Sequence, residues 1–156
     1  MMHHSAYRTS VLTTNFAGGF AGHELGDYLV QIDCDAQRKQ QRTPQGRFSL
    51  ARHAITYAAS QAAVRAGLYR AAGLHVPVLA QLTGAVVEGA AHAVIDDGRL
   101  LATFADLTGK RRFHDLAGSG VNGRALMDQA AHKGAQVPIG AITTTAVAAL
   151  IRKGRR

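Results

Sequence analysis

The stretch VPVLAQLTGAVVEGAAHAVIDDG, residues 76–98, decides the fold. Its proline suits the first turn of a helix, and its last glycine suits a helix end. Between these two residues the stretch is mostly apolar, but polar residues recur every four positions at Glu88, His92 and Asp96. Residues four apart lie on one face of a helix, because four residues make slightly more than one turn. The stretch therefore predicts an apolar helix with one polar face.

Glycine and proline residues divide the rest of the chain into further segments of this kind. Residues 38–47, with Pro44 and Gly46, and residues 110–122 are predicted to be loops. Alternating strand patterns are scarce. We predict further helices at about 15–37, with Asn15 as a cap, and at about 48–72, 99–107, 123–132 and 138–152.

These segments predict an all-α fold, a compact helical bundle of about five to six helices with short connections. The expected organisation is a flexible segment at residues 1–14, a single helical domain at 15–152 and a basic tail at 153–156. A chain of 156 residues that is 47% hydrophobic has the size and composition of one globular domain. The composition argues against a disordered chain.

Cysteine content and charge limit the classes of function. Cys34 is the single cysteine, which excludes an internal disulfide framework and a cysteine-cluster zinc site. Lysine and arginine outnumber the acids by 18 to 10, giving a formal net charge of +8. This charge permits an anionic partner, either a small substrate or a nucleic acid. The basic residues gather at 38–47, 99–112 and 152–156, as solvated loops or as a phosphate-binding surface.

Hydropathy gives no clear membrane span. The nearest candidates are residues 76–95, which Gln81, Glu88 and His92 interrupt, and residues 137–151, which are short for a span. The first ten residues lack the apolar core of a signal peptide. We expect a cytoplasmic protein and keep membrane-peripheral association as the alternative. The oligomeric state is not indicated.

Three other predicted helices carry polar rows with the same four-residue spacing. Three of the four rows pair a histidine with an aspartate. Facing helices in a bundle direct such pairs toward one internal point, where imidazole and carboxylate groups suit a divalent Zn, Mn or Fe ion. Buried without partners these groups would be costly, so inside the bundle they should satisfy one another or a ligand. The three further rows are His23, Asp27 and Gln31; His53, Tyr57 and Gln61; and Arg124, Asp128 and His132.

Each row alone also fits a simpler interpretation. A single histidine on an apolar helix is often a hydrogen-bonded core residue, and a His–Asp pair four residues apart is often a surface contact of about a few tenths of a kcal/mol. Residues 23–27, HELGD, are similar to the HExxH motif of zinc proteases, with Asp27 in place of the second histidine. Glycine is a poor helix former there, and Glu24 is expected on the surface.

The ordered set of rows resembles the domain of unknown function 3307 family of bacterial and phage proteins, over residues 17–134. The resemblance implies a helical protein with a histidine–aspartate centre, and many relatives look membrane-embedded. Glu24 and Glu88 fall outside the family pattern, which counts against both as site residues. The matching segments are Gly22 to Gln31, Ala36-Gln37 with Lys39, Arg52-His53-Ala54 with Thr56-Tyr57 and Gln61, His92 with Asp96 and Arg99, Leu107 to Lys110 with Phe113, and Asn122-Gly123 with Met127 to Ala130 and His132.

Together these patterns predict a metal-dependent hydrolase that acts on an anionic phosphoester or nucleotide-like substrate. The alternative is a non-enzymatic nucleic-acid-binding or accessory protein of a phage or mobile element, with the rows as a structural polar network. The predicted metal ligands are His23, Asp27, His92, Asp96 and His132. The predicted catalytic residues are His53, Asp128 and Lys110, and the predicted substrate contacts are Gln31, Tyr57, Gln61, Arg99, Arg124 and Gln129.

Overall fold

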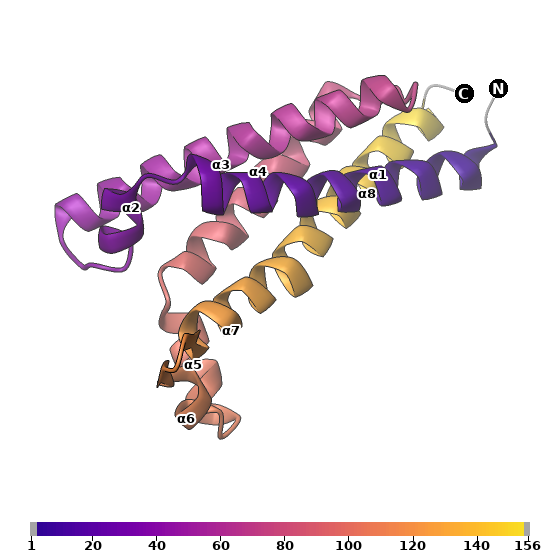
Figure 1. Cartoon of the computed structure of the whole chain (residues 1–156). Helices are drawn as coiled ribbons and strands as arrows, with labels where there is room; N and C mark the ends of the chain where they lie inside the picture. Colours follow the sequence, from indigo (N-terminus) through magenta and orange to yellow (C-terminus); the bar gives the residue numbers. More distant parts are fainter. Residues whose placement is uncertain (1–2, 155–156) are drawn as a thin grey trace.

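The computed structural model describes residues 3–154 and confirms the all-α prediction (Figure 1). The four longest helices are α1 (His4–Leu25), α3 (Pro44–Ala71), α4 (Val78–Asp96) and α8 (Val137–Gly154). Shorter helices are α2 (Asp33–Arg38), α5 (Arg99–Leu107), α6 (Arg111–His114) and α7 (Gly123–Ala131). The π-helical turn η1 (Gly26–Val30) extends α1, and a second one, η2 (His132–Gln136), joins α7 to α8. Strands β1 (Ala117–Gly118) and β2 (Val121–Asn122) form a small antiparallel hairpin.

The four long helices enclose one interior. Helix α1 packs against α3 and α8, and α4 packs against the same two helices on the other side. Both chain termini and the end of α3 lie at one end of the bundle, while α5, α6 and the hairpin lie at the far end of α4 (Figure 1). The order α1, α3, α4, α8 around the interior brings residues from all parts of the sequence together.

The N-terminal boundary of the first helix differs from the prediction. Helix α1 begins at His4, so residues 4–14, predicted to be flexible, are its first half. Asn15 is not a cap but a buried residue inside the helix. Its amide donates to the carbonyl of Val11 at 2.8 Å, and its side-chain oxygen accepts from the hydroxyl of Tyr69 at 2.5 Å. A tertiary contact to α3 therefore explains why an asparagine lies here inside the helix, although in the sequence it resembles an N-cap residue.

Two prolines predicted to lie in or beside helix breaks are helical residues instead. Helix α3 starts at Pro44, and the hydroxyl of Thr43 caps it by accepting from the backbone N–H of Gly46 at 3.1 Å. Proline is well suited to the first helical position because that position needs no N–H donor. Pro138 lies directly after the π turn η2, where the helix continues into α8 rather than breaking. The predicted tail is partly helical, since Lys153 and Gly154 end α8; residues 155–156 lie outside the described part of the chain.

The long helices approach each other closely through glycine. A side chain at Gly84 of α4 would collide with Thr144 of α8, and one at Gly140 of α8 would collide with Glu88 of α4. Close backbone approach through small residues increases packing contact without large hydrophobic side chains, as in helix pairs within membranes. The many glycines of this chain thus serve helix packing rather than turns alone.

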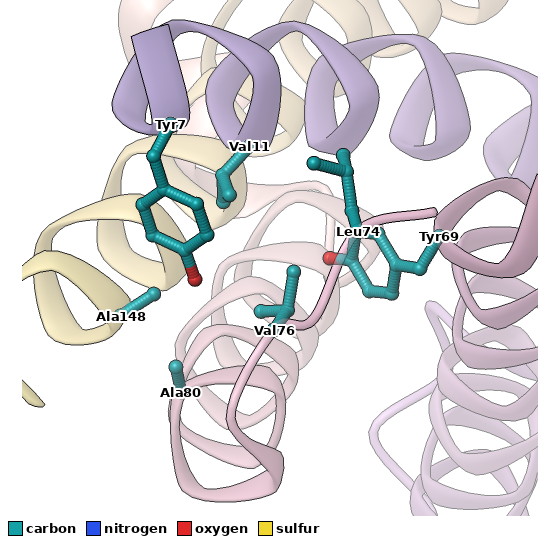
Figure 2. Close-up of a cluster of buried hydrophobic side chains, with 7 residues drawn as sticks. All are labelled: Tyr7, Val11, Tyr69, Leu74, Val76, Ala80 and Ala148. Carbon is teal, nitrogen blue, oxygen red and sulfur yellow. The ribbon is translucent and has the colours of Figure 1, made fainter. Parts of the chain in front are cut away.

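At the end of the bundle near the termini, the interior is apolar (Figure 2). The hydroxyl of Tyr7 there donates to the carbonyl of His75 at 2.9 Å. We call this group the terminal apolar cluster. Its buried members are Tyr7, Val11, Tyr69, Leu74, Val76, Ala80 and Ala148.

Elsewhere the distribution of polarity is inverted relative to a water-soluble bundle. Within residues 3–154, buried polar and charged side chains outnumber buried hydrophobic ones. Large apolar side chains point outward on every long helix or its extension: Leu29 is 77% exposed, Ile55 70%, Val86 71% and Leu150 69%. Two helical segments, Val78–Asp96 and the continuous Gly123–Gly154, are long and apolar enough to cross a membrane, and most of each is not buried by the protein.

Candidate metal centre

The predicted convergence of the polar rows is present in the structure. His23, His53, His92 and His132 come from four different helical segments, and each is 0% exposed. They surround Asp96, which is equally buried. Asp27 and Asp128 lie at the edge of the group, with side chains 4% and 16% exposed. We call these seven residues the His/Asp centre.

Four ligand atoms form a compact set on one side of the centre. The Nε2 atoms of His53 and His92 are 2.9 Å apart, and each lies 3.0–3.1 Å from Oδ2 of Asp96. Oδ1 of Asp27 lies 3.4 Å from Nε2 of His53 and 3.8 Å from Nε2 of His92. A tetrahedral ion with bonds of about 2.0–2.2 Å separates its ligand atoms by about 3.3–3.6 Å. The observed separations bracket that range, so this set fits one divalent ion.

The other oxygen of Asp96 faces a second set. Nε2 of His132 lies 3.4 Å from Oδ1 of Asp96 and 3.5 Å from Oδ2 of Asp128. Ligand atoms of these three residues all lie within 4.8 Å of one another. The ammonium of Lys39 also contacts Oδ1 of Asp96, at 2.7 Å. A cationic group is therefore already paired with this side of the carboxylate.

Gln136 fixes the orientation of two of the imidazoles. Its amide nitrogen donates to the hydroxyl of Tyr57 at 2.7 Å and to Oε1 of Glu88 at 3.2 Å, so its oxygen faces the other way. That oxygen accepts from Nδ1 of His132 at 2.6 Å and from Nδ1 of His92 at 3.2 Å. Because an amide oxygen only accepts, both Nδ1 atoms carry the proton. Both Nε2 lone pairs then point into the centre, as metal ligation requires.

His23 is oriented differently. The hydroxyl oxygen of Tyr57 accepts from the amides of Gln61 and Gln136, so its own proton is left to donate to Nδ1 of His23 at 3.4 Å. Nε2 of His23 therefore donates to the amide oxygen of Gln129 at 2.8 Å, and the Gln129 amide donates to Oδ2 of Asp27 at 3.2 Å. In this arrangement His23 supports the centre through hydrogen bonds. One of its nitrogens still lies within 4.8 Å of ligand atoms of His92 and His132.

The centre fits a cation better than a closed hydrogen-bond network. Among the described residues, Oδ1 of Asp27, Oδ2 of Asp96 and Nε2 of His132 are buried without a hydrogen-bond partner, although all three face other centre residues. Three carboxylates meet there, and Lys39 supplies the one ammonium in contact with Asp96. With the imidazoles neutral, as metal ligation requires, two negative charges remain, which a divalent ion would balance. With these unsatisfied acceptors and this excess of negative charge, the centre could hold a metal ion.

Four supporting residues were missed or discounted in the sequence. Glu88, which was set aside, is buried and pairs with Arg65 at 2.6 Å, and it also orients Gln136. The four-residue spacing of Glu88 from His92 and Asp96 was the sequence signal that could have identified it. Gln136 follows His132 by four residues, so the same spacing could have identified it. Arg65 follows Gln61 by four residues and extends that row, whereas Lys39 belongs to no row and has its partner far away in the sequence.

Lys39 is held near the centre by a short helix. Asp35 of α2 is buried and accepts from Nε of Arg52 at 2.9 Å and from Nη2 at 2.6 Å. These hydrogen bonds from Arg52 hold the pKa of the Asp35 carboxyl below its usual value, against the effect of burial. The carboxylate therefore stays charged at neutral pH. The pair fixes α2 on α3 and so positions the turn that carries Lys39.

Both π turns lie at the centre. Asp27 is inside η1, and His132 and Gln136 begin and end η2. A π turn inserts an extra residue into a helix and rotates the following side chains, and such turns are frequent at functional sites. They let Asp27 approach His53 and let Gln136 reach two imidazoles. The predicted helix at 15–37 runs through η1 without a π turn, and the break predicted between residues 132 and 138 falls on η2, where the helix is continuous.

The remaining predicted site residues divide into two groups. Tyr57, Gln61 and Gln129 belong to the hydrogen-bond network described above. Arg99 pairs with Asp97 on the surface, and Arg124 is exposed at the start of α7, so neither reaches the centre. Gln31 follows η1 with extended backbone, which removes it from the helical face of Asp27. Lys110 is exposed and lines a separate groove, and His53, predicted as catalytic, lies within the first ligand set.

No family model, curated protein or solved structure matches this chain. The resemblance to the domain of unknown function 3307 family therefore stays a prediction. Conclusions about function depend on the geometry of the centre and on the surface around it.

Proposed function

We propose that this protein is a metal-dependent hydrolase whose substrate is an anionic phosphoester. The observation that carries the proposal is the set of inward-facing ligand atoms around Asp96, of which Oδ1 of Asp27, Oδ2 of Asp96 and Nε2 of His132 are unsatisfied. A divalent ion bound by these residues supplies Lewis acidity and makes a hydrolytic nucleophile available near neutral pH. Buried imidazoles already freed at Nε2 by Gln136 are organised to bind it.

The chain's own residues around the centre suit an anionic substrate. Asp128 is the most exposed member of the His/Asp centre, so it lies where a substrate would enter. It is the residue placed to accept a proton there. Lys39, 12% exposed, supplies positive charge beside Asp96. A cation beside a centre that binds metal favours a phosphoryl group over a neutral ester.

A groove beside the centre supports a substrate that also has an apolar part. It has a volume of about 490 Å³ and lies between the end of α4, α5 and α7. Ile95, Met127 and Ala131 line it, and each directly precedes a residue of the His/Asp centre. Lys110 is the one charged residue of its lining. A hydrocarbon chain in the groove, with an anionic group near Lys110 and the centre, would match this distribution.

We further propose that the four long helices lie in a lipid bilayer. The length of each suits a hydrocarbon core that needs about 20 residues to cross. Between Lys133 and Arg152 no residue is charged, and between Arg52 and Arg70 the one charge is Arg65, paired inside with Glu88. Apolar side chains point outward, whereas charges face the interior, as expected for a protein in lipid. Basic residues at both ends of the helices would lie at the two interfaces.

Fractionation separates this setting from the predicted cytoplasmic one. Expressed protein should stay with membranes after an alkaline carbonate wash and should need detergent to become monodisperse. Protein that is released by the wash and is monodisperse in buffer would overturn the membrane proposal. It would leave the metal centre unaffected.

The hydrolase proposal is tested on protein purified without a histidine tag. We expect stoichiometric metal by elemental analysis, hydrolysis of a long-chain alkyl phosphoester, loss of that activity with a chelator and recovery with Zn²⁺ or Mn²⁺. Metal-free protein with unchanged folding, or metal-loaded protein inactive on mono- and diesters, would contradict the proposal. Metal-free protein with salt-dependent DNA binding would favour the accessory-protein alternative.

A further inference from the structure

We propose that the centre is dinuclear, with the two oxygens of Asp96 bridging two divalent ions. This inference deepens the proposed function, since it concerns the same centre. The first ion would be bound by Asp27, His53, His92 and Oδ2 of Asp96, and the second by Asp128, His132 and Oδ1 of Asp96. Each set is compact on its own, and the two oxygens of Asp96 are divided between the two sets.

The number of ligands argues for two ions. Zinc in proteins takes four ligands, sometimes five. Asp27, His53, His92 and Asp96 alone complete that number. Asp128 and His132 would then remain as a ligand pair with no ion, with Nε2 of His132 buried and unsatisfied. A second ion on this side gives that nitrogen a partner.

The net charge of the centre also argues for two ions. Three carboxylates and Lys39 leave two negative charges in the centre, so one divalent ion makes it neutral. A neutral centre offers no electrostatic attraction to a phosphoester. A second divalent ion makes the centre positive and complementary to that anion, and in two-metal phosphatases ions about 3.5–4 Å apart stabilise both the attacking and the leaving oxygen.

The position of Lys39 marks the second ion's side. Its ammonium contacts Oδ1 of Asp96, the oxygen assigned to the second ion, and does not contact Oδ2. Oδ1 thus already attracts a cation separate from the first ligand set. Because the ammonium competes for this oxygen, removal of Lys39 should strengthen binding of the second ion rather than weaken it.

Metal stoichiometry tests the inference without any substrate. Purified protein in detergent is loaded with Mn²⁺, washed free of excess and measured by elemental analysis and electron paramagnetic resonance. We expect two ions per chain and an exchange-coupled spectrum. Asp128→Asn should retain one ion, with the spectrum of isolated Mn²⁺, while the matched variant Asp97→Asn keeps two, because Asp97 pairs with Arg99 outside the centre. Lys39→Met should lower the dissociation constant of the second ion.

The outcomes separate the inference from the proposed function. One ion per wild-type chain, or two coupled ions in Asp128→Asn, would overturn the dinuclear centre. The single ion retained by Asp128→Asn also shows that the variant is folded. Two coupled ions in a protein that hydrolyses no phosphoester would uphold the centre and reject the hydrolase. Hydrolysis of a phosphoester by a protein with one ion would uphold the hydrolase and reject the dinuclear centre.

Discussion

The terminal apolar cluster and the His/Asp centre are built on the same four long helices and their extensions, yet their interiors are opposite in character. In the cluster, Tyr7, Val11 and Ala80 fill the space between helices with apolar side chains (Figure 2). In the centre, imidazoles and carboxylates fill the equivalent space and leave acceptors unsatisfied. Replacing buried ionic groups by apolar ones often leaves stability unchanged or raises it. The apolar end therefore maintains the packing, whereas the polar end is explained by ligand binding.

The largest effect is expected from Asp96→Asn. The change removes a charge that two histidines and Lys39 contact within 3.1 Å. Loss of several kcal/mol of transition-state stabilisation corresponds to at least about a 1000-fold fall in kcat/KM. Metal content should fall with it, as elemental analysis will show. The neighbouring variant Asp97→Asn is the control, and an Asp96→Asn protein with full metal content would remove the functional difference between the two ends.

A substitution in the apolar cluster should act in the opposite way. Leu74→Ala removes buried side-chain volume and should lower the free energy of unfolding by about 2–4 kcal/mol. Metal content per folded chain should not change. Leu79→Ala is the matched control, because Leu79 points outward and its truncation should cost no more than about 0.5 kcal/mol. Thermal unfolding in detergent with elemental analysis measures both quantities; metal loss in folded Leu74→Ala would show that the two ends are coupled.

Gln136→Leu tests whether orientation of the imidazoles matters. The variant removes the oxygen that accepts from Nδ1 of His92 and His132, so neither ring is held with Nε2 free. Loss of such a supporting hydrogen bond typically reduces metal affinity or activity about 10- to 100-fold. Gln81→Leu is the control at the apolar end, where the amide bonds only the carbonyl of Val76. Equal metal affinity in both variants, measured by titration with Zn²⁺, would assign Gln136 a packing role alone.

The sequence predicted what depends on local periodicity. The four-residue spacing of His92 and Asp96 within an apolar helix identified the polar face, because residues one helical turn apart share a face in any helix. The same rule failed for Gln31, where the helix has already ended, and for Arg124, which is exposed at the start of α7. Periodicity defines a face but not how far along the helix the neighbouring helices reach.

What the sequence could not predict depends on contacts between distant segments. Lys39 meets Asp96 across 57 residues, and a basic residue in a polar stretch looks like any solvated lysine. Gly134 indicated a break, although the helix continues through the π turn that places Gln136, and no signal indicated the π turn that places Asp27. The outward apolar faces were visible only once the interior proved polar. A mean hydropathy of −0.03 hides this inversion, because buried polar residues offset exposed apolar ones.

The smallest expected effect concerns the groove and separates substrate shape from chemistry. Ala130 lines the groove, and Ala130→Trp should fill part of it. We expect kcat/KM for a long-chain alkyl phosphoester to fall about tenfold, since pocket contacts of this size contribute about 1–3 kcal/mol. A short-chain ester should be cleaved as before, because the His/Asp centre is untouched. Leu126→Trp on the same helix is the control, since Leu126 is exposed and does not line the groove. An equal loss for both esters would mean that the tryptophan disturbs the centre, and no loss for either would mean that substrate chains do not use the groove.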